Sequence, residues 1–177
     1  GDVYKRQADS NYNSATSSAT AFTISRASSS VTASGATTYT YTAATPQGPA
    51  STSSVTGSGG AVTYSYSGTA NGGATYGPSA TRPTNAGSYT MTATVASDNN
   101  YNSASGTINF TIDKATPTLT PVVGPYTYSG SAQGPNSISS TGSTGTVTYS
   151  YSGTGGTSYG PSSTAPSAAG SYTVTAT

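Results

Sequence analysis

Residues 88–95 read "SYTMTATV", a stretch in which every second side chain is apolar or aromatic. Successive side chains of a β-strand point to opposite faces, so this alternation predicts a strand with one buried face and one hydroxyl-covered face. The same alternation occurs in "AVTYSYS" (61–67) and "TINFTI" (107–112). No stretch has apolar residues at helical spacing, and β-branched and aromatic residues dominate the periodic segments. The sequence therefore predicts an all-β protein.

Turn-forming residues separate these predicted strands. "GSGG" (57–60), "NGG" (71–73) and "YGPS" (76–79) supply the glycine, asparagine and proline that tight turns need. Short strands at this spacing, six or seven to a unit, predict antiparallel β-sandwiches. A neighbouring β topology such as a β-grasp remains open. The predicted core consists of Val31, Tyr39, Tyr41, Val55, Val62, Tyr64, Tyr66, Tyr89, Met91, Val95, Ile108, Phe110 and Ile112.

An internal repeat organises the chain. "TGSGGAVTYSYSGT" (56–69) returns as "TGSTGTVTYSYSGT" (141–154), and both copies are followed by "YGPS" and "AGSYT". These pairs give a period of about 86 residues, the size of one immunoglobulin-like domain. In "AGSYT", Tyr89 and Tyr172 stand where such sandwiches have a tyrosine corner, whose hydroxyl bonds a nearby backbone group. The alternative is an ordinary turn that leads into a strand.

The phase of the repeat predicts the domain boundaries. We expect a complete sandwich over residues 28–115, the first repeat, and a sandwich truncated before its closing strands over residues 116–177, the second repeat. Residues 8–27 match the end of a repeat, because "TAFTISRA" (20–27) aligns with "INFTIDKA" (108–115). We expect this segment to complete the truncated repeat of an adjacent copy, either within one long chain or as a donated strand. The short junction "IDKATPT" (112–118) predicts a stiff connection between repeats.

The chemistry-bearing residues are few. The chain has 5 basic and 4 acidic residues, a formal net charge of +1, and no His, Cys, Trp or Glu. The usual general bases, thiol nucleophiles and most metal ligands are therefore missing, and we expect no catalytic, metal-binding or cofactor-binding residue and no enzymatic activity. So little positive charge makes nucleic acid an improbable partner, and no apolar window is long enough to insert into a membrane.

Loop residues offer one candidate binding chemistry. Tyr76 and Tyr159 could stack on sugar rings, with Asn99 and Asn102 as polar contacts, which would make the chain a glycan-binding adhesin repeat. The alternative is that each tyrosine closes the end of a sandwich. The loop at 97–103, with Asp98, could hold Ca²⁺ or could form an Asx turn with Tyr101 packed inward.

Two resemblances complete the sequence interpretation. The stretch from Ala86 to Thr120, its partial copy at 8–27 and the end "YSGTGGTSYGPSSTAPSAAGSYTVTAT" (151–177) resemble the MBG-type and related immunoglobulin-like tandem repeats of large bacterial surface and secreted proteins. That resemblance implies an extracellular or cell-surface stalk, fibre or adhesin, with neighbouring repeats or copies of itself as partners. The opening "GDVYKRQ" (1–7) resembles a translated sequencing-adapter scar from environmental DNA, which implies an uncultured bacterium.

Overall fold

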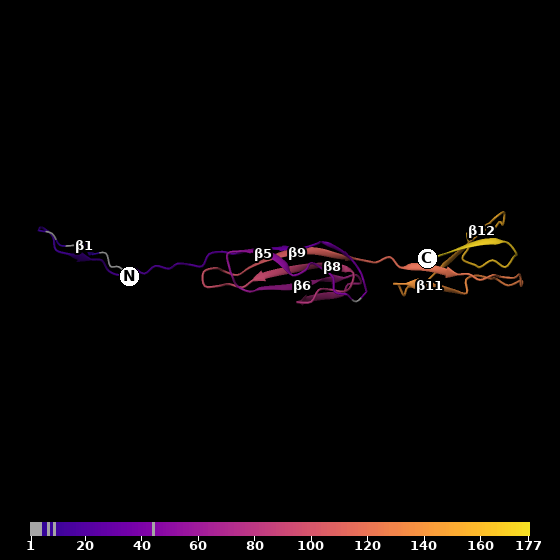
Figure 1. Ribbon diagram of the computed structural model, residues 1–177, viewed down its shortest axis with the longest axis horizontal. Coiled ribbons are helices and arrows are strands. Elements are labelled where there is room, and N and C mark those ends of the chain that lie inside the picture. Colours follow the sequence, from indigo (N-terminus) through magenta and orange to yellow (C-terminus); the bar gives the residue numbers. More distant parts are fainter. Residues whose placement is uncertain (1–4, 7, 9, 44) are drawn as a thin grey trace.

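The computed structural model describes residues 5–6, 8, 10–43 and 45–177, and all regular elements within them are β-strands, which confirms the predicted all-β class. The first repeat contains seven strands (Figure 1). They are β3 (Ser30–Ser34), β4 (Thr38–Thr40), β5 (Thr52–Thr56), β6 (Val62–Ala70), β7 (Thr75–Ser79), β8 (Gly87–Val95) and β9 (Ala104–Asp113).

The seven strands form two sheets. Five of them lie in the order β4-β9-β8-β6-β7, and β3 pairs with β5 in the other sheet. β3 lies so close to β9 that a Cβ added at Gly106 would fall 2.2 Å from the carbonyl oxygen of Val31. This arrangement is consistent with a β-sandwich. The expectation of antiparallel sheets is wrong at one edge, where β4 runs parallel to β9. β4 follows β3, a strand of the other sheet, after only three residues, and no hairpin joins it to β9 to impose antiparallel pairing.

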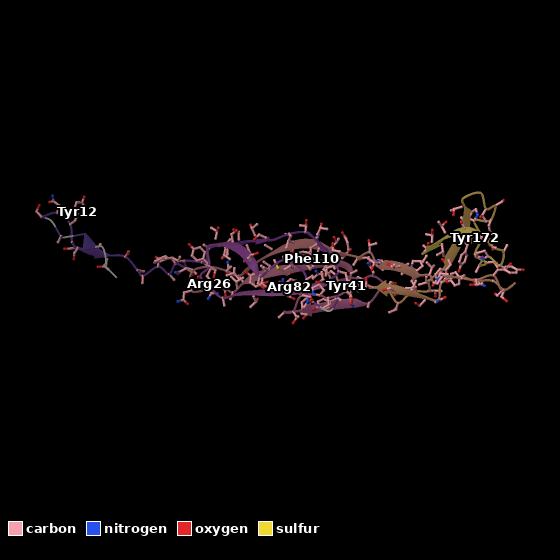
Figure 2. All side chains as sticks on the ribbon, turned by 45° about the vertical axis from the view of Figure 1, so that its right-hand side comes forward. Tyr12, Arg26, Tyr41, Arg82, Phe110 and Tyr172 are labelled. Atoms are coloured by element: carbon pink, nitrogen blue, oxygen red, sulfur yellow. The ribbon has the colours of Figure 1, made fainter. Side chains whose placement is uncertain are left out.

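The core of the first repeat is aromatic. Tyr66, Tyr89, Met91, Phe110 and Ile112 form one buried cluster. The ring of Phe110 lies 5.8 Å from that of Tyr39 and 5.6 Å from that of Tyr89, with edge-on and stacked geometry respectively. Every residue of the predicted core is buried or half-buried, so that prediction is confirmed. Figure 2 shows where Phe110 lies along the first repeat.

The second repeat has fewer strands. They are β10 (Thr118–Val122), β11 (Ser137–Thr141), β12 (Tyr149–Thr154) and β13 (Ser171–Ala176), paired as β10-β11 and β12-β13. Residues 123–129, which correspond to the β4 region, form no strand. In the first repeat β4 pairs only with β9, and the second repeat has no counterpart of β9 within the described chain. Without that partner, the β4 counterpart has no sheet to join.

The N-terminal segment lies outside both repeats. Figure 1 shows it stretching from one end of the first repeat while the second repeat lies beyond the other end. Its strands β1 (Lys5–Arg6) and β2 (Ala15–Thr16) pair with each other, and residues 10–28 are exposed. The expected adapter scar falls mostly outside the described residues. Among the residues that the structure describes, no helix could cross a membrane.

Candidate functional site

Both tyrosines proposed to contact sugars are bonded within their own repeats. The hydroxyl of Tyr76 donates to the Thr81 carbonyl at 2.7 Å, and that of Tyr159 donates to the Thr164 carbonyl at 2.7 Å. The Tyr76 ring packs edge-on against Tyr89 at 5.9 Å. Both rings are half-buried, as expected of residues that close the end of a sandwich.

The rings beneath them are tyrosine corners. Tyr89 donates its hydroxyl proton to the Asn85 carbonyl at 2.9 Å, and Tyr172 does the same to the Ala168 carbonyl at 2.9 Å. Burial raises the pKa of Tyr89, so this hydroxyl stays protonated and remains a donor. The predicted tyrosine corner is therefore confirmed in both repeats.

The loop at 97–103 is organised around one carboxylate. Asp98 accepts backbone hydrogen bonds from Gly59, Asn100 and Tyr101, each at 2.8 Å. These donors, that of Gly59 foremost, hold the pKa of Asp98 below its ordinary value. The geometry is that of the predicted Asx turn, and it also ties this loop to the "GSGG" loop at 57–60.

A buried hydroxyl reinforces that connection. The Ser58 Oγ donates to the Ala96 carbonyl at 2.6 Å and accepts from the Gly60 backbone at 3.0 Å. Ser58 is 7% exposed. Sequence reasoning missed this residue, because one buried serine looks like any other in a chain so rich in serine.

The structure does not bring the predicted sugar contacts together. Tyr76 lies beside Tyr89 near the start of β8, whereas Asn99 and Asn102 follow the end of that strand. From Tyr89 to Val95, its last residue, β8 spans about 20 Å, and both asparagines lie beyond that end. Asn102 is also engaged with the start of the repeat, since its backbone N–H donates to the Ala27 carbonyl at 2.8 Å. The four residues therefore do not share one surface, and a glycan site built from them remains a prediction.

The second repeat instead contains an open groove of about 470 Å³. Its walls include four residues whose sequence positions match the surroundings of Phe110 in the first repeat: Tyr126 for Tyr39, Gly134 for Gly48, Tyr151 for Tyr66 and Tyr172 for Tyr89. In the first repeat Phe110 fills this space so closely that a Cβ at Gly48 would meet its ring at 2.8 Å. The groove therefore corresponds to the position that Phe110 and β9 occupy in the first repeat.

Apolar side chains are left exposed around this groove. Tyr126 is 44% exposed and Tyr128 is 70% exposed, whereas their counterparts Tyr39 and Tyr41 are half-buried. The Tyr126 hydroxyl bonds the Gly134 carbonyl across the groove. Burial, followed by the neighbouring Tyr149, Tyr126 and Tyr159 hydroxyls, raises the pKa of Tyr151. The groove is thus an uncharged, tyrosine-lined slot beside the free edge of β13.

Comparison with known proteins adds no relative: no protein-family description, no curated protein and no solved structure matches this chain. Within the described residues there is also no group of three or more His, Cys, Asp or Glu side chains that could hold a metal ion.

Proposed function

We propose that this chain is a non-enzymatic structural segment of an extracellular bacterial stalk or filament, built from tandem immunoglobulin-like repeats. The observation that carries the proposal is the end-to-end arrangement of two repeats across a connector of only four residues, 114–117 (Figure 1). Pro117 fixes its own φ and restricts Thr116, so the connector has little conformational freedom. Units joined in this way form an extended, stiff chain rather than enclose a binding site.

The shared internal contacts support the immunoglobulin-like assignment. Both repeats carry a tyrosine corner near the start of a strand, and both place a second tyrosine edge-on against it, at 5.9 Å and 5.7 Å. In each repeat a glutamine backbone N–H, from Gln47 or Gln133, donates to a proline carbonyl at 2.8 Å. One sequence pattern is therefore used twice to build the same unit, as a tandem array requires.

The use of polar groups also supports a structural role. The Asp98 carboxylate satisfies three backbone donors, and Thr90 and Thr94 on the outer face hydrogen-bond across the strand pair to Asn109 and Ser105 at 2.8 Å each. Surfaces of this kind keep β propensity without charge repulsion between neighbouring copies.

Distance measurement between the repeats tests the proposal. The chain has no cysteine, so Thr63→Cys and Ser150→Cys place one spin label on an exposed position of each repeat. Doubly labelled chain diluted into unlabelled chain should give one narrow intramolecular distance distribution. The matched control inserts a flexible Gly-Ser segment after Lys114 and should broaden it. An equally broad distribution in both proteins would contradict a stiff stalk.

A further inference from the structure

We propose that residues 17–25 of one copy bind along β13 in the second repeat of another copy, where Phe22 fills the open groove. This inference rests on the proposed function in one respect: it treats the repeats as units that join end to end. The groove needs an apolar, uncharged strand, because none of its lining residues is charged. The segment supplies one. Phe22 is 85% exposed and Ile24 is 87% exposed, although their sequence counterparts Phe110 and Ile112 are buried at 2% and 1%.

The first repeat defines the register of the proposed strand. There Phe110 lies opposite Tyr89 and Ile112 lies opposite Gly87 in the β8-β9 pair. Carried over position by position, Phe22 would lie opposite Tyr172, and Ile24 would lie beside Gly170 at the start of β13. The free edge of β13 would gain the backbone hydrogen bonds that β9 gives to β8.

The same strand would order the β4 counterpart. Tyr39 pairs in parallel with Ile112, and Tyr41 donates its backbone N–H to the Asp113 carbonyl at 2.9 Å. In the second repeat Tyr126 would therefore pair with Ile24, and Tyr128 would bond the Ser25 carbonyl. The proposed strand thus accounts for both the open groove and the two exposed tyrosines.

The chain's own segment cannot reach its own groove. Ala27 is fixed by a bridge to Tyr101, which precedes β9, whereas the second repeat begins after β9. The five residues from Phe22 to Ala27 span at most about 17 Å. The ten residues of β9 alone span about 33 Å. For residues 17–25 to fill a groove of this kind, the donor must therefore be a second copy.

Disulfide trapping between copies tests this register. In the first repeat the Thr90 hydroxyl donates to the Asn109 side chain at 2.8 Å, so these two positions face each other on the outer surface. Their counterparts are Thr173 and Ala21, both exposed. The chain has no native cysteine, so full-length A21C and T173C proteins, mixed and oxidised, can form one kind of heterodimer. We expect that heterodimer to be the main product, because paired strands hold Cα atoms within disulfide range.

Two matched controls make the result specific. S17C is also exposed but lies four residues from the paired position, about 13 Å away along the strand, so its heterodimer with T173C should form at least tenfold less. Adding Phe22→Ser and Ile24→Ser to the A21C chain removes the apolar anchors and should lower cross-linking at least tenfold. Circular dichroism would confirm that each variant stays folded.

Four outcomes would overturn the proposal. The first is an equal heterodimer yield from S17C and A21C, and the second is a heterodimer yield that Phe22→Ser and Ile24→Ser do not lower. The third is a T173C homodimer, in which two grooves meet, as the main product. The fourth is an intramolecular disulfide in a dilute chain that carries both A21C and T173C. A narrow distance distribution between the repeats alongside any of them would leave the stalk proposal intact. If instead A21C and T173C cross-link as expected but the spin-label distance distribution is broad, the stalk proposal would be contradicted and the strand exchange supported.

Discussion

Replacing Phe110 with alanine is the strongest test of how the first repeat is held together. The ring is 2% exposed and contacts the rings of Tyr39, Tyr66 and Tyr89 at centroid distances of 5.8, 6.4 and 5.6 Å. The ring also packs directly against Gly48, where it leaves no room for a Cβ atom. Truncating such a ring removes transfer free energy and leaves a cavity, so we expect a loss of about 3–5 kcal/mol.

That loss is a large share of the stability of one domain. Single domains are stable by about 5–15 kcal/mol, and each 1.4 kcal/mol is tenfold in the folding equilibrium, so Phe110→Ala should shift it by about three orders of magnitude. The chain offers a matched control of the same residue type. Phe22 is 85% exposed, and Phe22→Ala should change the free energy of unfolding by less than about 0.5 kcal/mol in dilute, monomeric protein.

Hydrogen exchange read out by mass spectrometry can separate the two repeats. Peptides from β6, β8 and β9 report the first repeat, and peptides from β12 and β13 report the second. Phe110→Ala should accelerate exchange in the first set and leave the second set unchanged, and denaturant titration of the same proteins gives the free energy. A loss below about 1 kcal/mol, or an equal loss from Phe22→Ala, would refute the assignment of Phe110 to the core.

Further substitutions test individual contacts. The pKa of Asp98 is lower in the folded chain than in the unfolded chain. Its contribution to stability is therefore present above the unfolded-state pKa and is lost as pH falls through the folded-state pKa. Asp98→Asn should remove this loss of stability below about pH 4, which thermal unfolding at several pH values would measure. Gly48→Ala should destabilise the first repeat by more than about 1 kcal/mol, because its Cβ would clash with the Phe110 ring, whereas Gly72→Ala, also at positive φ but with open space around it, should cost less in denaturant titrations. Tyr89→Phe should cost about 1 kcal/mol in the same assay through loss of the bond to the Asn85 carbonyl, and no measurable loss would contradict the tyrosine corner.

Most of the first repeat could be predicted from its alternating pattern. β8 and β9 were readable because Met91 and Phe110 sit in runs where the other face is threonine or asparagine, and a one-residue slip would expose the whole apolar set. Tyr39 and Tyr41 were correctly assigned to the core for the same reason. Alternation reports which face is buried, however, and carries no information on which strand lies alongside.

The features that escaped prediction depend on partners far away in sequence. The parallel pairing of β4 with β9 joins residues 73 positions apart, as in Thr38 with Thr111, and no local signal encodes it. The buried Ser58 hydroxyl donates its hydrogen bond to the Ala96 carbonyl across 38 positions. The Asx turn at Asp98 was predictable, since its Asn100 donor is local, but its third donor, Gly59, was not.

A comparison of the two repeats shows which structural features form without the closing strand and which need it. Tyr172 keeps the ring contact and hydrogen bond of Tyr89 without a closing strand, and Tyr151 keeps the strand register of Tyr66, so the β12-β13 pairing and the tyrosine corner do not depend on a closing strand. Tyr126 and Tyr128 do not keep theirs, because the β4 position exists only against β9. Since Tyr39 and Tyr41 are half-buried beside β9 whereas Tyr126 and Tyr128 are exposed, the closing strand accounts for the difference between these two pairs of tyrosines. In the tandem array that we propose, the closing strand at each junction would therefore decide whether the repeat that it completes is fully ordered.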